Sequence, residues 1–202
     1  MNSRTNLQRL ATLAVIALSL AACEQATAPV APTRLAPPPR EQWVAISDTF
    51  VNTFTVPLTD GGSASIDLGY GNRIVFPRGA ASICDLQSSI YGAATWNRPC
   101  AAETEPVTFT VKLWKDASGQ PRVDFSPSVR FVNDDANPVM LYLYTPSGSM
   151  AWLSNIMYCP TARSLCYDES QLDPELATHA SGATGYVYRR VKHFSGYNVV
   201  AD

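Results

Sequence analysis

The chain has 202 residues, a formal net charge of −2, 46% hydrophobic residues and 16% charged residues. This mildly acidic composition argues against a nucleic-acid-binding protein, and against a protein that binds anionic lipid through a basic patch. The one basic cluster, Arg189, Arg190 and Lys192, alternates along a predicted strand, so we expect it at a solvated edge.

The amino terminus has the organisation of an export signal. Arg4 and Arg9 flank the start of an apolar run, Leu10 to Leu20, which is shorter than the roughly 20 residues that span a bilayer and is typical of a signal peptide over residues 1–22. The sequence Leu-Ala-Ala-Cys at residues 20–23 resembles the bacterial lipobox, which implies that Cys23 carries lipid and binds the bilayer. Glu24 favours the outer membrane of a Gram-negative-type bacterium, with the face left open.

Residues 23–42 follow as a Pro- and Ala-rich segment. Such a composition cannot build a packed core and favours extended polyproline geometry, so this segment is expected to be a disordered tether. Residues 43–202 then suffice for a single domain with one core.

The four remaining cysteines are an even number, as expected for an oxidising compartment. We expect the two local disulfides, Cys84 with Cys100 and Cys159 with Cys166. A four-cysteine zinc site is the alternative, but the spacing lacks the Cys-x-x-Cys pairs that such sites use.

The domain is predicted to be all-β, because runs rich in β-branched and aromatic residues alternate with Gly, Pro, Asn and Asp turns. The expected strands are 53–58, 64–69, 72–76, 107–114, 139–145, 150–158, 185–191 and 196–200. Their number and spacing favour an antiparallel β-sandwich. One short helix is expected over 173–182, with Asp173 as N-cap, Pro174 in the first turn, Gly182 as its end and His179 exposed.

Three motifs in order resemble the ZU-type domain of netrin receptors, ankyrins and zonula-occludens scaffolds. They are RIVFPRGAAS (73–82), VDFSPSVRFVNDDANPVMLYLY (123–144) and VKHFSGYNV (191–199). The chain departs from the family at Ser128-Val129, where a glycine is common after the proline. Residues 84–105 and 159–182 look like insertions, called here the first and the second insertion. The resemblance implies a β-sandwich used for contacts with a protein partner that it does not identify.

His193 and Ser195 are the candidate catalytic residues. On a strand they would share one face, but a hydrolytic triad also needs a carboxylate and an oxyanion hole, and the sequence places neither. The ZU-type resemblance implies a second possibility, self-cleavage at the Phe194–Ser195 bond, with Ser195 as nucleophile and His193 as base. The structural alternative is that the segment is one strand, with Phe194 in the core.

Two further sites are weaker hypotheses. The acidic loops at residues 134–135 and 168–173 offer oxygen ligands for calcium, although neither has an EF-hand spacing and acidic turns are usually solvated. The many tyrosines indicate either core packing or a surface for protein or glycan. If a loop makes contacts, we expect it to be the first insertion, through Tyr91, Trp96, Asn97 and Arg98. The sequence indicates no cofactor.

Overall fold

The computed structural model describes residues 49–115, 120–145, 153–160 and 165–201. The signal peptide, Cys23 and the tether, predicted for residues 1–42, lie outside this part. Within it the strands form two antiparallel five-stranded sheets, which confirms the all-β sandwich class. The described residues contain no helix that is both long and apolar enough to cross a membrane.

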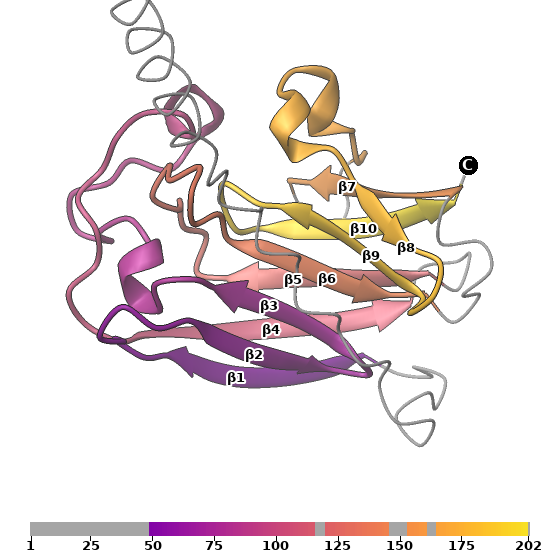
Figure 1. Ribbon diagram of the computed structural model, residues 1–202, viewed down its shortest axis with the longest axis horizontal. Helices are drawn as coiled ribbons and strands as arrows, with labels where there is room; N and C mark the ends of the chain where they lie inside the picture. The colour runs from indigo at the N-terminus through magenta and orange to yellow at the C-terminus, as the bar shows by residue number, and fades with distance from the viewer. Residues whose placement is uncertain (1–48, 116–119, 146–152, 161–164, 202) are drawn as a thin grey trace, which may run out of the picture. The chain divides into compact units, whose positions relative to one another are not determined.

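The first sheet has the strand order β1-β4-β5-β10-β7. Its strands are β1 (Phe50–Val56), β4 (Val107–Lys115), β5 (Pro121–Ser126), β10 (Gly196–Ala201) and β7 (Ser154–Cys159). The closing strand β10 lies between β5 and β7, so the carboxyl end of the chain is built into the interior of this sheet (Figure 1).

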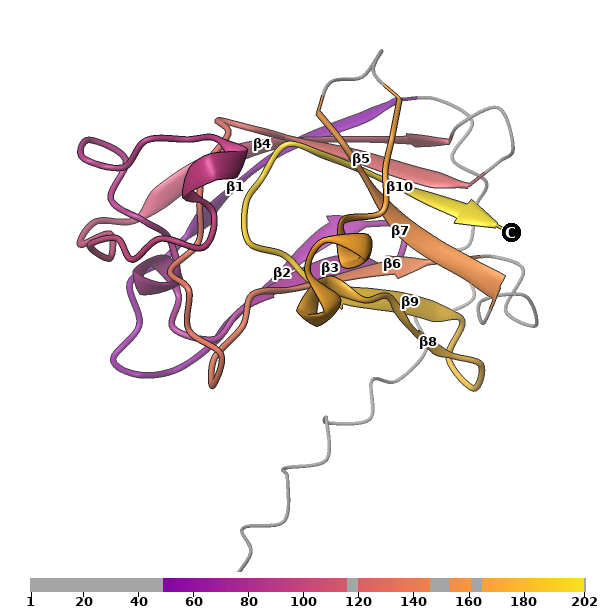
Figure 2. The ribbon, with the colours of Figure 1, turned by 90° about the horizontal axis from the view of Figure 1, so that it is seen from above.

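The second sheet has the order β2-β3-β6-β9-β8. Its strands are β2 (Ala64–Gly69), β3 (Asn72–Phe76), β6 (Met140–Tyr144), β9 (Tyr186–Arg190) and β8 (His179–Ser181). Seen from above, the two sheets form separate layers (Figure 2). The core lies between them.

Strand β4 shows why these residues form a sandwich. Val107, Phe109, Val111 and Leu113 are buried, whereas the residues between them face outward, as predicted from their alternation. Phe194 occupies the middle of the core, where its ring stacks on that of Phe125 with centroids 3.9 Å apart. Three further phenylalanine rings meet it edge-on, those of Phe76, Phe109 and Phe131.

The predicted helix over 173–182 is wrong. Asp173 does cap a turn and Pro174 begins it, but the turn is a 3-10 turn of three residues, Pro174–Leu176. The chain then extends into β8, in which His179 pairs with Tyr188 of β9. A helix of ten residues is marginal by itself, and pairing with the open edge of β9 provides hydrogen bonds that the short helix cannot match. His179 is exposed, as expected.

Both predicted disulfides are present. Cys84 is joined to Cys100, and Cys159 to Cys166. Each therefore closes a loop within one insertion, and neither links the two sheets directly. In Figure 1 the turn at Ala93–Thr95, in the first insertion, and the turns at Glu169–Gln171 and Pro174–Leu176, in the second, lie in the upper part of the picture.

Candidate functional site

The HFS segment, residues 193–195, lies just before β10 and is not part of it. Strand β10 begins at Gly196, whereas His193 makes an isolated bridge with Arg130. The backbone is held on both sides, since Phe194 N donates to Val129 O at 2.8 Å and Phe125 N donates to Ser195 O at 2.7 Å. The expected strand position of His193 and Ser195 is therefore wrong, while the expected core position of Phe194 is confirmed.

His193 is completely buried and has a carboxylate partner. Its Nε2 lies 2.8 Å from Oε1 of Glu169, and Oε2 of the same carboxylate accepts a hydrogen bond from Arg189 Nη2 at 2.8 Å. Arg189 is also fully buried and donates to the carbonyl of Ile156 at 2.7 Å. Burial lowers the pKa of His193, and the bond to Glu169 offsets only part of this effect. Burial therefore favours the neutral form of His193, which lies beside the buried ion pair of Glu169 and Arg189.

Aromatic rings enclose the imidazole. Trp96 of the first insertion stacks on it, with centroids 3.6 Å apart, and Tyr158 of β7 meets it edge-on at 4.5 Å. The hydroxyl of Tyr197 donates to the carbonyl of His193 at 2.7 Å. The Tyr91 hydroxyl lies 3.5 Å from Nδ1, and burial raises the pKa of Tyr91. The first insertion thus closes over the histidine.

Ser195 is buried, but its hydroxyl makes no hydrogen bond with any described residue. In particular, no hydrogen bond joins it to His193. The Tyr91 hydroxyl is its polar neighbour on the histidine side: burial raises the pKa of Tyr91, and a side-chain hydrogen-bond interaction with Ser195, longer than 3.5 Å, offsets part of the rise. The carboxylate that a triad requires is present in Glu169, but the direct serine–histidine contact is not formed.

The basic cluster is not a solvated edge, contrary to the prediction. Arg189, Arg190 and Lys192 are all buried, and each is paired with an acid of the second insertion. Lys192 Nζ donates to Asp173 Oδ2 at 2.6 Å and to Asn97 Oδ1 at 2.8 Å, so it ties the two insertions together. Burying three cations requires acidic partners, which the second insertion supplies.

The carboxylates considered as calcium ligands instead form ion pairs or hydrogen bonds within the protein. Asp134 pairs with Arg78 and Asp135 with Arg190, while Asp168 accepts hydrogen bonds from Ser170. Burial favours the neutral form of Asp173, but Lys192 outweighs this effect and holds the pKa of Asp173 below its usual value. Among the described residues no three potential ligands lie close enough to hold a metal ion.

Of the residues proposed for contacts in the first insertion, the structure packs one against His193 and leaves the others exposed. Trp96 packs inward on His193, and Asn97 is exposed but bonded to Lys192. Arg98 is exposed, and its carbonyl accepts a hydrogen bond from Arg130. Tyr91 keeps 36% of its surface exposed. Trp96 is therefore part of the packing of the insertion, and the exposed members are Tyr91, Asn97 and Arg98.

The exposed large apolar side chains are concentrated in the two insertions. Six of the eight found among the described residues lie there: Leu86, Ile90, Tyr91, Leu165, Tyr167 and Leu172. The two groups are joined through a line of rings, because Tyr91 contacts His193, His193 contacts Tyr158 and Tyr158 contacts Tyr167. We call these six residues the insertion face.

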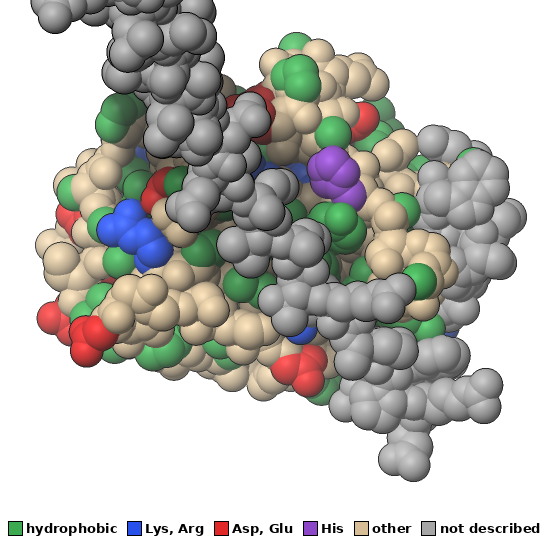
Figure 3. Space-filling view, in the orientation of Figure 1, with side chains coloured by type: hydrophobic (Ala, Val, Ile, Leu, Met, Phe, Trp, Pro, Cys, Tyr) green, Lys and Arg blue, Asp and Glu red, His purple; other side chains and the backbone are tan. Residues whose placement is uncertain are grey.

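Tyr142 and Tyr188 belong to a row on the outer side of the second sheet. Arg73, Tyr142, Tyr188 and His179 are cross-strand neighbours, and the rings of Tyr142 and Tyr188 are stacked at 5.3 Å. His179 stacks on Tyr188 at 5.5 Å, and a histidine is visible beside hydrophobic side chains in Figure 3. Because the rings cover one another's faces, this row stabilises the sheet and offers mainly ring edges to a ligand.

Sequence reasoning placed Glu169 among the possible calcium ligands and missed its pairing with His193 and Arg189, which organises the site. Glu169 lies in the second insertion, 24 positions before His193, and no local motif marks it. One signal was present: residues 168–175 contain four acids, and residues 189–192 contain three bases. That complementarity points to pairing between the two segments.

In comparisons with known proteins, no family model, no curated protein and no solved structure matches this chain.

Proposed function

We propose that this chain is a non-enzymatic, exported β-sandwich lipoprotein that contacts another protein of the cell envelope through its insertion face. The observation that carries the proposal is the concentration of exposed apolar side chains on two insertions that buried contacts hold together. Exposed apolar side chains concentrated on a rigid frame are typical of a protein contact, and tyrosine suits a half-wet interface.

Export and anchoring are supported by separate features. Two disulfides suit an oxidising compartment. The lipobox-like sequence ending at Cys23 supports lipid attachment, and the Pro-rich tether would hold the domain away from the bilayer. Glu24 favours the outer membrane, and the ZU-type resemblance agrees with a role in protein contacts.

The proposal predicts the result of crosslinking in intact cells that express the full chain. Replacing Ile90 and Leu172 by Ser should reduce the crosslinked species several-fold, because both side chains are largely exposed and contribute little to folding. Leu58→Ser is the matched control, since Leu58 is exposed outside both insertions. A Cys23→Ala variant should leave the membrane fraction. Equal crosslinking in all variants would refute the contact face, and membrane retention of Cys23→Ala would refute the anchor.

Self-cleavage is a second candidate, favoured by the carboxylate-bound His193 two residues before Ser195, whose hydroxyl has no described hydrogen-bond partner within 3.5 Å. In that reaction Ser195 Oγ attacks the Phe194 carbonyl carbon, and the C–N bond breaks as the hydroxyl proton passes to the amine. Water then hydrolyses the ester to give a Phe194 carboxylate. Two features oppose it. Neither Phe194 nor Ser195 has the left-handed φ that would indicate backbone strain. The backbone of the HFS segment is also hydrogen-bonded on both sides.

We therefore expect one uncut species. Intact mass measured on the denatured mature protein should show a single chain that retains residues 195–202. A species that ends at Phe194 would establish cleavage, and its absence from a Ser195→Ala variant would assign the nucleophile.

A further inference from the structure

The outermost strands of the two sheets differ in how their free edges are protected. In the described part of the chain these strands are β1 and β7 in the first sheet, and β2 and β8 in the second. The free edge of a strand displays unpaired N–H and C=O groups, so it is a template on which a further strand can pair. Natural sheets shorten, charge, bend or cover such edges.

Three of these edges are protected. The second insertion covers the edge of β7, because Tyr158 pairs with Tyr167 and the amide of Ile156 donates to Thr178 Oγ1 at 2.9 Å. Strand β8 is only three residues long. Strand β2 carries the exposed charge of Asp67, and its register with β3 shifts immediately after that residue.

Strand β1 is the unprotected edge. Its seven residues, Phe50–Val56, contain no charge and no proline, and all of them pair with β4 in one continuous register. Val51, Asn52, Thr53 and Thr55 are exposed, Val51 to 59%. In Figure 1 β1 lies at the lower edge of the sandwich, and no described strand pairs with its other side. The edge is therefore open to a further strand.

The backbone groups on this open edge can be identified from Asn52. Its Oδ1 accepts a hydrogen bond from the amide of Thr53 at 2.8 Å, so that amide points away from β4. Amides of alternate residues point to the same side of a strand, and those of Val51 and Thr55 therefore lie on the open edge as well. Because the Asn52 side chain is exposed, an incoming strand can displace it.

We propose that β1 pairs antiparallel with β1 of a second copy of this chain, across a two-fold axis at Thr53. Thr53 is the midpoint of the strand, so this register pairs all seven residues and sets the edge groups of Val51 opposite those of Thr55 in the other copy. Thr53 meets its own counterpart, and β1 and β4 already form threonine pairs, as in Thr55 Oγ1 to Thr108 Oγ1 at 2.9 Å. Across a two-fold axis each central charge meets itself, and β1 has no charge to repel its copy.

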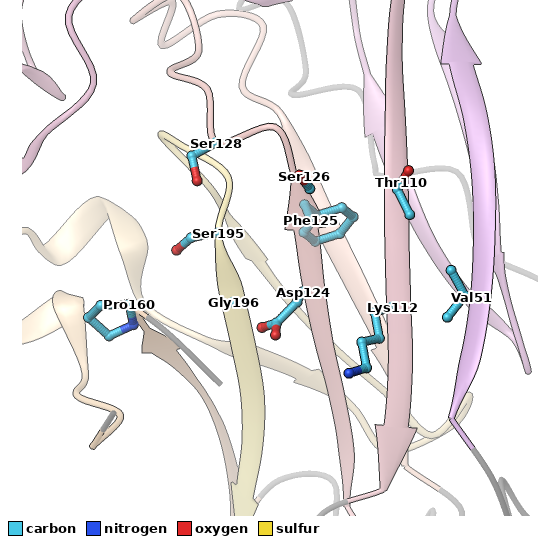
Figure 4. A pocket seen from close by; sticks show the side chains of 10 residues that line it. All are labelled: Val51, Thr110, Lys112, Asp124, Phe125, Ser126, Ser128, Pro160, Ser195 and Gly196. Atoms are coloured by element: carbon cyan, nitrogen blue, oxygen red, sulfur yellow. The ribbon is translucent and has the colours of Figure 1, made fainter. Parts of the chain in front are cut away.

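The outer side of the first sheet continues from β4 onto β1. A pocket opens on this side, and it is lined by Val51 of β1, by Thr110 and Lys112 of β4 and by Ser195 just before β10 (Figure 4). Pairing of two copies partly covers the apolar side chain of Val51. The interface lies at the opposite end of the first sheet from β7, on which the second insertion packs, so the proposal does not depend on the insertion face.

The test is sedimentation velocity of the mature chain with Cys23→Ala, a change that prevents lipid attachment, from micromolar to millimolar concentration. We expect a reversible dimer. Thr53→Lys brings two like charges together at the axis and should weaken dimerisation at least tenfold. Thr110→Lys is the matched control, because Thr110 is the exposed register partner of Thr53 on β4 and is not at the edge, so this variant should dimerise as the wild type does.

Crosslinking with a short bismaleimide tests the register. In the proposed pairing the side chains of Thr53→Cys lie about 5 Å apart at Cβ and should be linked. Those of Val51→Cys lie about 13 Å apart along the strand and should not be. A wild type that remains monomeric at millimolar concentration would leave the edge to a strand of another protein and refute the proposal. Undiminished dimerisation of Thr53→Lys, or equal crosslinking of the two cysteine variants, would refute it too.

Discussion

Replacing Glu169 by Ala is expected to lower the free energy of unfolding by about 3–5 kcal/mol, because it leaves the Arg189 charge buried without its partner. The same change removes the hydrogen bond to His193 Nε2. Each kcal/mol corresponds to a decrease in melting temperature of about 2–4 °C in a domain of this size. Urea unfolding followed by tryptophan fluorescence measures the effect, since Trp96 stacks on His193.

Glu175→Ala is the matched control. Glu175 also pairs with an arginine, but its side chain is 52% exposed, so its removal should cost about 1 kcal/mol or less. Glu169→Gln keeps the volume of the side chain and removes its charge, so it separates the electrostatic loss from the cavity. If Glu169→Ala and Glu175→Ala lower the free energy of unfolding equally, the buried pairing of Glu169 with Arg189 and His193 does not stabilise the second insertion.

The fold class could be predicted because it depends on local patterns. The alternation in β4 follows from burial of one face of a strand, and the disulfides follow from cysteines that are near in sequence. Strand β8 could not be predicted in this way. Its residues have fair helical capping signals, and the extended conformation is favoured only because it pairs with the open edge of β9. Edge pairing depends on distant residues, so no local pattern contains it.

The site was less predictable for a related reason. Alternating basic residues on a strand usually face solvent, but here the second insertion covers the strand and supplies the acids that pair with Arg189, Arg190 and Lys192. Likewise, Trp96 seemed available for contacts because it lies on a loop, yet it fills the space over His193. Insertions supply side chains that pair with residues of the sandwich, and the sequence alone does not show where these side chains will pack.

The HFS segment connects these environments within three residues. His193 faces the buried ion pair beneath the insertions, Phe194 enters the core, and Ser195 lines the pocket on the outer side of the first sheet. Phe194 thus points away from the environments of both of its neighbours. The segment therefore couples the insertions, the core and the pocket, and Phe194 is the residue that fixes its position.

Phe194→Ala is accordingly expected to lower the free energy of unfolding by about 3–5 kcal/mol, within the range for a fully buried phenylalanine. The loss includes the stacked contact with Phe125 and the edge contacts with Phe76, Phe109 and Phe131. Since these rings come from strands of both sheets and from the loop that follows β5, they cannot collapse into the cavity together.

Phe50→Ala provides the comparison, because Phe50 is only partly buried and packs on Tyr70 at the margin of the core. Its removal should cost clearly less, and urea unfolding of both variants measures the difference. If Phe194→Ala destabilised the chain no more than Phe50→Ala, the HFS segment would not be anchored by its phenylalanine. The positions of His193 and Ser195 would then depend on the insertions alone, and the Glu169→Ala variant would displace Ser195 from the pocket as well.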